Sequence, residues 1–229
     1  MTSRLPENGE LSRQGGSANT ELRIPDAADR ETLSAFVARA VRLDLLALVR
    51  LRNRGNGVVE AWVATPFEVL ATRAVHGEIT PRDVTVSGNE LLAALTITPG
   101  ERMDPGPPRD LMWHSELPAG GDWPQVDLVP AKVISELAEK GAALARDNLG
   151  PQGTPPASLL DQAVLTVTEG SLEVKIPMRC LFALSGMGFV DSSIPDDVVR
   201  VTATSSWLRL DARYGAVLRR RHALLPLLF

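Results

Sequence analysis

A length of 229 residues suits one large domain or two small ones, and the 44% apolar and 23% charged residues are typical of a globular protein. The net charge of −4 disfavours nonspecific binding to nucleic acid or anionic membranes as the main role. The single Cys excludes an internal disulfide and a cysteine-based metal cage. No apolar stretch is long enough to span a bilayer, and the N-terminus lacks the apolar core of a secretory signal, so we expect a cytoplasmic protein.

Residues 1–20 are polar and contain Gly and Ser, so we expect a disordered N-terminal tail. For residues 21–229 the pattern predicts a single α+β domain, in which antiparallel hairpins and meanders pack with about four helices. Only three of the 24 basic residues are Lys, and this excess of Arg favours a GC-rich bacterial genome as its cause.

The elements predicted before residue 98 are a strand at 21–25, a helix at 29–43, strands at 45–52 and 58–65, a strand at 80–86 and a helix at 87–97. Asp29 can cap the first helix, where apolar residues recur at helical spacing from Leu33 to Val41. Residues 65–76 fit either a capped helix or a turn and strand. The β-branched residues in this segment favour the turn and strand.

The Pro- and Gly-rich segment 98–110 is a predicted hinge between possible halves at 21–100 and 111–229. After it we expect a strand at 111–117, an irregular segment at 119–129, a helix at 130–149, a hairpin of 165–167 with 172–176, a helix at 177–186, and strands at 198–204 and 207–213, with an extension over 214–221. Each half then has hairpins and one long helix, which permits a pseudo-symmetric pair.

Catalytic motifs are not evident in the sequence, which favours a protein without enzymatic activity. The three His residues are far apart, and neither a metal nor a cofactor is expected. Cys180 lies in an apolar run, which indicates a buried structural thiol, although Arg179 could activate it if it were exposed. The sequence SGMGF at 185–189 lacks the third Gly and the Lys of a phosphate loop and is interpreted as a helix end.

The main hypothesis is a protein-binding, adaptor-like or chaperone-like module whose partner is another protein or a second copy. It depends on a basic cluster beside the apolar end ALLPLLF at 223–229. The candidate partner-binding residues are Arg209, Arg213, Arg219, Arg220, Arg221, His222 and Phe229. A competing interpretation is that these arginines form the solvent face of a strand and blunt a sheet edge.

Two alternatives stay open. The first is a small-molecule-binding protein or enzyme with a site between the halves, where polar residues flank the Pro- and Gly-rich loops. The candidate residues for that site are Arg109, His114, Asp161, Gln162 and Arg179. The second is nucleic-acid binding through the C-terminal arginines, which the acidic pI of about 5.5 disfavours.

Overall fold

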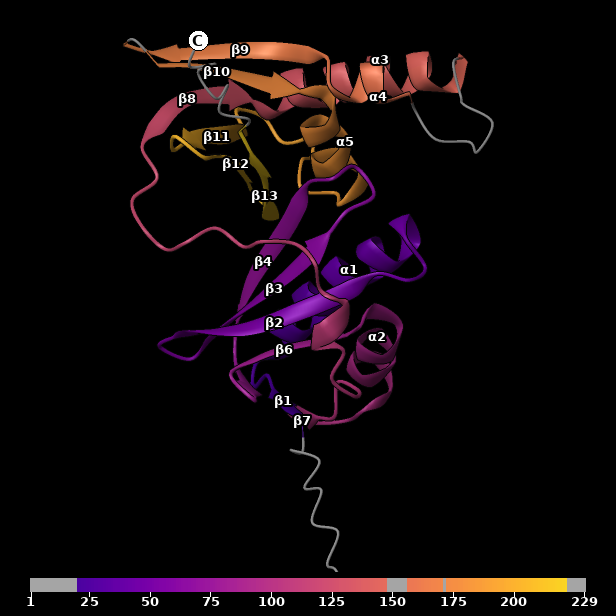
Figure 1. The fold of residues 1–229 in the computed structure, drawn as a ribbon. Helices are drawn as coiled ribbons and strands as arrows, with labels where there is room; N and C mark the ends of the chain where they lie inside the picture. The colour runs from indigo at the N-terminus through magenta and orange to yellow at the C-terminus, as the bar shows by residue number, and fades with distance from the viewer. Residues whose placement is uncertain (1–19, 148–155, 171, 222–229) are drawn as a thin grey trace, which may run out of the picture.

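A computed structural model of the protein describes residues 20–147, 156–170 and 172–221 (Figure 1). In these residues antiparallel strands combine with five α-helices, which confirms the predicted α+β class. Residues 1–19 of the predicted tail lie outside the described residues, as do His222 and Phe229. Within the described part of the chain, each helix is too short or too polar to cross a lipid bilayer.

The first half of the molecule, residues 20–103, follows the predicted order of elements. Its elements are β1 (Glu21–Arg23), α1 (Ala27–Leu43), β2 (Leu48–Gly55), β3 (Val58–Ala64), β4 (Leu70–His76), β5 (Glu78–Thr80), β6 (Asp83–Ser87), α2 (Gly88–Ile97) and β7 (Arg102–Met103). The predicted apolar face of the first helix is buried in α1 from Leu33 to Val41. Residues 65–76 form a turn followed by β4, because both the hydroxyl and the N–H of Thr65 donate to the Val69 carbonyl.

The second half, residues 125–221, repeats parts of this order. After the short helix η1 (Asp110–Met112), its elements are β8 (Gln125–Pro130), α3 (Ala131–Asp147), α4 (Ala157–Leu160), β9 (Ala163–Glu169), β10 (Leu172–Pro177), α5 (Met178–Gly186), β11 (Val198–Ala203), β12 (Trp207–Ala212) and β13 (Gly215–Arg220). In each half a short strand leads into a helix of 17 residues, and two later strands lead directly into a shorter helix. The predicted pseudo-symmetric halves are therefore confirmed.

Eight strands form one antiparallel sheet in the order β6-β2-β3-β4-β13-β12-β11-β8. The joint between the halves lies in the middle of this sheet, where β4 pairs with β13. The paired residues are Leu70 with Leu218, Ala71 with Val217 and Thr72 with Ala216. Because the sheet is continuous, backbone hydrogen bonds connect one half to the other.

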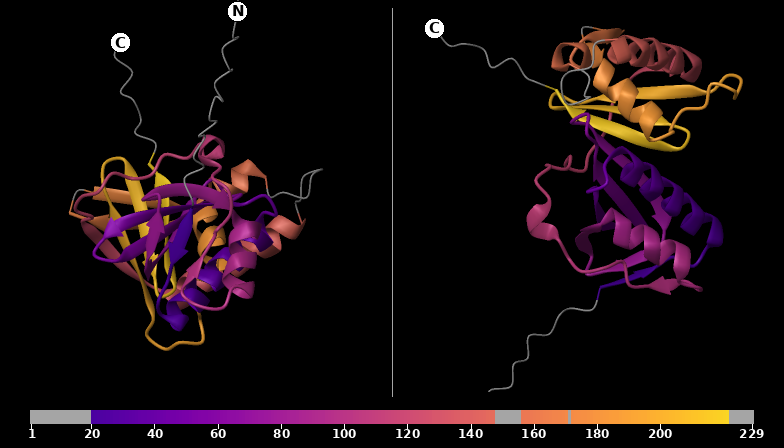
Figure 2. Two further views of the ribbon diagram at one scale, coloured as in Figure 1. Left: turned by 90° about the horizontal axis from the view of Figure 1, so that it is seen from below. Right: turned by 90° about the vertical axis from the view of Figure 1, so that its right-hand side faces the viewer.

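Helices cover one face of this sheet (Figure 2). Helix α1 contacts β4, α2 contacts β6, α5 contacts β13, and α3 packs against α5 and β8. The buried apolar residues on this side form one cluster that spans both halves. Two pairs of aromatic rings cross the joint, Phe36 with Phe189 at 6.1 Å and Phe67 with Phe182 at 5.8 Å between ring centroids.

The two outer strands of the large sheet have capped edges. On β6, the N–H of Thr85 donates to Asp110 Oδ1 at 2.6 Å, and the Thr85 carbonyl accepts from the N–H of Arg109 at 2.7 Å. On β8, the N–H of Leu128 donates to Asp127 Oδ1 at 2.7 Å. These contacts occupy backbone groups that would otherwise be available to another strand.

The segment between the halves differs most from the prediction. The predicted hinge at 98–110 includes β7, which pairs with β1 and therefore belongs to the first half. The predicted strand at 111–117 is wrong, because the chain turns away from the β6 edge at η1 and has no strand to pair with. We call residues 104–124 the connector. The irregular segment predicted at 119–129 is also partly wrong, since residues 125–130 pair with β11 as strand β8.

The first helix begins earlier than predicted. Asp26, not Asp29, is its N-cap, and Asp26 Oδ1 accepts from Ala28 N at 2.7 Å. Asp29 instead accepts from the backbone N–H of His76 at 3.2 Å, which ties α1 to the end of β4. The predicted strand at 80–86 is divided into β5 and β6 by residues 81 and 82.

Candidate protein-docking surface

The second face of the large sheet carries the tryptophan cluster. This cluster consists of all four Trp residues in the chain: Trp62, Trp113, Trp123 and Trp207. Trp62 lies on β3 and Trp207 on β12, on opposite sides of the joint. Their strand neighbours Ala61 and Leu208 belong to the main core on the helix side. Alternation along the strands therefore gives the sheet an apolar helix face and a tryptophan-rich outer face.

The connector covers this outer face between the two halves (Figure 1). It contributes Trp113 and Trp123 to the cluster, and its Leu117 also packs against the buried residues of this face. The indole N–H of Trp113 donates to the Ser115 carbonyl at 2.6 Å. The indole N–H of Trp62 is buried and has no hydrogen-bond partner in the described part of the protein. The connector thus supplies half of the cluster and shields the rest.

Three arginines lie over rings of the tryptophan cluster. The pairs are Arg50 with Trp113 at 6.0 Å, Arg209 with Trp123 at 5.7 Å and Arg220 with Trp207 at 5.4 Å. Each guanidinium also pairs with a carboxylate: Arg50 with Asp83, Arg209 with Asp211 and Arg220 with Glu116. The hydrogen bond to Asp83 raises the pKa of Arg50 above its usual value. Charge on this face is thus largely compensated within the protein.

A pocket of about 310 Å³ opens on this face beside the connector. Trp123, Trp207 and Arg220 line it. At η1, two large apolar side chains point into solvent: Leu111 is 95% exposed and Met112 is 55% exposed. Trp and Arg beside a pocket are typical of hot spots in protein interfaces, and exposed apolar residues often mark docking sites. This composition makes the connector face the candidate docking surface.

The predicted partner-binding arginines are spread over three places. Arg209 and Arg220 lie on the connector face, as described above. Arg219 points to the helix side and pairs with Asp161 at 3.2 Å. Arg221 donates to the carbonyls of Thr204 and Glu173, at 2.9 and 3.0 Å. Arg213, in the turn after β12, pairs with Asp197 at 3.2 Å.

Two of the residues predicted for a site between the halves are in direct contact. Arg179 is 3% exposed, and its Nη2 donates to Asp161 Oδ1 at 2.6 Å. Its Nη1 donates to Glu68 Oε2 at 2.7 Å and to the Phe67 carbonyl at 3.0 Å. Because Phe67 and Glu68 lie in the β3–β4 turn, Arg179 links the second half to the first.

The other residues of that predicted site lie apart or act through the backbone. The Gln162 carbonyl accepts from the N–H of Met178 at 2.9 Å. Arg109 pairs with Glu90 at 2.8 Å in the first half. His114 is exposed on the connector. The structure therefore does not bring Arg109 or His114 to the Arg179 contact.

Cys180 is buried and free of disulfide bonding. Burial raises the pKa of its thiol to about 12, although Arg219 and Arg179 partly oppose this effect. The thiol is therefore protonated at neutral pH and shielded from reagents. Among residues 20–147, 156–170 and 172–221, no group of three His, Cys, Asp or Glu side chains could hold a metal ion.

The tryptophan cluster was not predicted from the sequence, because its members are separated by up to 145 residues along the chain. The available signal was strand alternation, which places Trp207 and Arg209 on the same face. The pairing of β4 with β13, which brings Trp62 near Trp207, has no local signal in the sequence.

Comparisons with known proteins divide the chain at the connector. Residues 17–115 match the model of a family described as a domain of unknown function, DUF8010. Residues 118–224 match a second such family, DUF8185. No curated protein matches the sequence.

Among solved structures, the chain is similar in fold to bacterial sliding clamps. A protein from Eubacterium rectale, provisionally identified as a DNA polymerase III beta subunit, gives a TM-score of 0.59 at 12% identity over 88% of this chain and 64% of that one. The beta subunit of DNA polymerase from Streptococcus pyogenes gives 0.56 at 10% identity, over 87% and 64%. The DnaN sliding clamp of Bartonella birtlesii, bound to griselimycin, gives 0.55 at 14% identity, over 90% and 66%. The chain thus covers less than two thirds of these proteins.

Proposed function

We propose that this protein is a protein-binding scaffold with sliding-clamp architecture, which acts in the cytoplasm without catalysing a reaction. The observation that carries the proposal is the connector face, which has the tryptophan cluster and three arginines across the joint and two exposed apolar residues at η1, beside the β6 edge. The partner is a protein that contacts both halves and the connector. The similarity in fold to sliding clamps supports a role in presenting a surface to other proteins.

The chemistry of the connector face favours a protein over a small polar ligand. Leu111 and Met112 offer apolar area to a partner without any rearrangement of the chain. At the other end of the connector, the pocket beside Trp123 and Trp207 can take one apolar anchor, and Arg220 lines it. Anchors in such pockets account for most of the binding free energy in many interfaces.

The test is to introduce a charge at the exposed helix η1, with the substitution Leu111→Glu. Because Leu111 is 95% exposed, this change should leave the fold intact. Partners are first identified by cross-linking and mass spectrometry from cells that express the tagged protein. Binding of the purified partner is then measured by calorimetry. We expect Leu111→Glu to weaken binding by at least about tenfold, because a charge replaces buried apolar area.

The matched control is Leu46→Glu. Leu46 is 85% exposed, but it lies in the turn between α1 and β2 and is not part of the connector. It should bind the partner as the unmodified protein does. Equal binding by all three proteins would exclude the connector face as the docking surface.

A further inference from the structure

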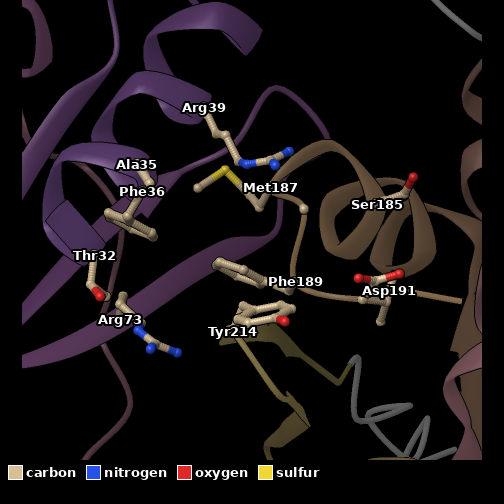
Figure 3. Close-up of a pocket in the computed structure, with 12 residues that line it drawn as sticks. Thr32, Ala35, Phe36, Arg39, Arg73, Ser185, Met187, Phe189, Asp191 and Tyr214 are labelled. Carbon is tan, nitrogen blue, oxygen red and sulfur yellow. The ribbon is translucent and has the colours of Figure 1, made fainter. Parts of the chain in front are cut away.

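A second pocket lies on the helix side of the joint, away from the tryptophan cluster (Figure 3). Its volume is about 550 Å³. The first half contributes one face of α1 and Arg73 from β4. The second half contributes Ser185 at the end of α5, residues 187–191 after this helix, and Tyr214 from the β12–β13 turn. Both halves are therefore needed to build it.

The floor of this pocket is aromatic. Phe36 and Phe189 are stacked across the joint, with an angle of 4° between their planes. The ring of Tyr214 lies next to Phe189 in the pocket, and Tyr214 is 44% exposed (Figure 3). Such a floor can hold an apolar side chain of a ligand, and an aromatic ring could stack on it.

Two arginines enter the pocket without a carboxylate partner. Arg39 has no hydrogen bond or ion pair with any described residue. Arg73 makes one hydrogen bond, from Nη1 to the Arg213 carbonyl at 3.3 Å, and its buried Nε has no partner in the described chain. In Figure 3 these side chains lie on opposite sides of the aromatic rings. Most other arginines at the joint are paired, so these two have unused capacity to bind anions.

The pocket also contains one acidic side chain, Asp191. Its carboxylate is already engaged, since Oδ1 accepts from the hydroxyl and the N–H of Ser193 at 2.6 and 2.9 Å. These hydrogen bonds lower the pKa of Asp191, so it stays ionised near neutral pH. Asp191 and Arg73 lie at opposite ends of the pocket in Figure 3, so the Asp191 carboxylate does not neutralise the Arg73 guanidinium.

Gly188 keeps Arg39 in place. Its φ of +62° is in the left-handed region, and a Cβ at this position would overlap the guanidinium of Arg39. The second residue after α5 must therefore be Gly for the Arg39 guanidinium to keep its observed position. This contact couples the end of α5 in the second half to α1 in the first.

We propose that this pocket binds an acidic segment of a partner protein, in which an Asp or Glu lies next to a large apolar residue. Arg39 binds the carboxylate, and the floor of Phe36, Phe189 and Tyr214 takes the apolar side chain. Arg73, on the other side of the rings, adds positive charge to the pocket. Charge complementarity selects this occupant, because the pocket contains two guanidiniums without a carboxylate partner and only one carboxylate, which is already hydrogen bonded to Ser193. The proposal is independent of the connector face.

The experiment uses two pools of fluorescein-labelled, end-blocked heptapeptides. One pool has Asp or Glu at the centre, flanked by Leu, Phe or Tyr, and the other has Asn or Gln at the centre. Fluorescence polarisation with the full chain should show binding of the acidic pool that is about tenfold tighter than binding of the amide pool. Arg39→Gln should remove most of this difference. Equal binding of the two pools, or no binding of either, would overturn the proposal.

Two glycine variants separate the role of Arg39 from backbone strain. Gly188→Ala displaces the guanidinium and should weaken binding as much as Arg39→Gln does. Gly170→Ala is the control, because Gly170 has a similar φ of +57° but nothing within 4 Å of the added Cβ. It should bind like the unmodified protein. If Gly188→Ala retains full affinity, the Arg39 contact is not part of the site.

Three further measurements complete the test. Should Arg39→Gln fail to fold, Arg39→Lys keeps the charge but loses bidentate geometry, and it should bind with intermediate affinity. Phenylacetate should displace the labelled acidic peptides only weakly. If it displaces them as well as unlabelled acidic peptide does, the pocket is a small-molecule site and the proposal is overturned. Leu111→Glu should bind the acidic pool normally, so a failure of the connector face is distinguishable from a failure of this pocket.

Discussion

At the start of α5, the buried Arg179 connects the two halves, and the buried Cys180 lies next to it. Arg179 donates to Asp161 in its own half and to the β3–β4 turn of the other half. Asp161 also pairs with Arg219, so one half-exposed carboxylate serves two guanidiniums. These contacts fix α5 beside the joint. They also surround the neighbouring thiol with positive charge, which only partly offsets the effect of burial on its pKa.

We expect Cys180 to make the protein less stable at alkaline pH. Its pKa is about 12 in the folded state, above its ordinary value of 9.0. The resulting stabilisation is complete below about pH 9 and is lost as the pH rises toward 12, because the unfolded thiol ionises first. The slope approaches about 1.4 kcal/mol per pH unit. Urea unfolding of the protein and of Cys180→Ala should give free energies that converge above about pH 9 and cross before about pH 10.5.

The difference between the two proteins isolates this thiol, because other groups titrate equally in both. Cys180→Ala is expected to be less stable at pH 8 by about 1 kcal/mol, through lost packing. Its free energy of unfolding should then fall less steeply with pH. Parallel curves would contradict the raised pKa.

At the scale of elements, the connector has a second role besides covering the tryptophan cluster. The N–H of Thr85 on β6 donates to Asp110, and the carbonyl of Thr85 accepts from the N–H of Arg109. An uncapped outer strand in an eight-stranded sheet can pair with a second copy. The start of η1 thus closes the sheet at the edge of the first half.

Asp110→Ala should therefore open the β6 edge. We expect self-association in sedimentation velocity at concentrations where the unmodified protein stays unchanged. A loss of about 1 kcal/mol of stability should accompany it, because a buried N–H loses its acceptor. Asp104→Ala is the control, since Asp104 also lies in the connector and accepts from a backbone N–H, that of Gly106. Unchanged sedimentation of Asp110→Ala would show that this contact does not protect the edge.

Local patterns predicted most elements of the fold, and tertiary pairing decided the rest. The buried face of α1 followed from helical spacing, and the turn at 65–69 followed from β-branched residues after it. Strand β8 was missed because it lies between Pro124 and Pro130 and is fixed only by pairing with β11. The 550 Å³ pocket was missed because its arginines and aromatic residues come from both halves. Among the residues that line it, the glycines of SGMGF at 185–189 were recognisable from the sequence as a helix end.

At the scale of the whole molecule, the distribution of charge over the helices bears on whether the protein binds nucleic acid. The only charged residue of α2 is Glu90, and in α3 the basic residues are matched by acidic ones. The C-terminal arginines Arg219 and Arg221 make contacts within the protein. Helices α2 and α3 therefore carry no net excess of positive charge, which favours weak binding to phosphates.

We accordingly expect weak binding to DNA despite the fold. Fluorescence anisotropy with a labelled 30-base-pair duplex should show no saturable binding at about 150 mM salt, where nonspecific DNA-binding proteins have Kd values of roughly 1–100 μM. A saturable isotherm with a steep dependence on salt would contradict this expectation. It would then favour nucleic-acid binding through surfaces that include the C-terminal arginines.

The joint in the large sheet also has a mechanical consequence. Strands β4 and β13 are joined over three residue pairs, whereas β3 and β4 share seven and β12 and β13 share six. Tension applied between the halves therefore falls on the shortest ladder in the middle of the sheet. If this ladder breaks, the connector of about twenty residues still joins the two halves covalently.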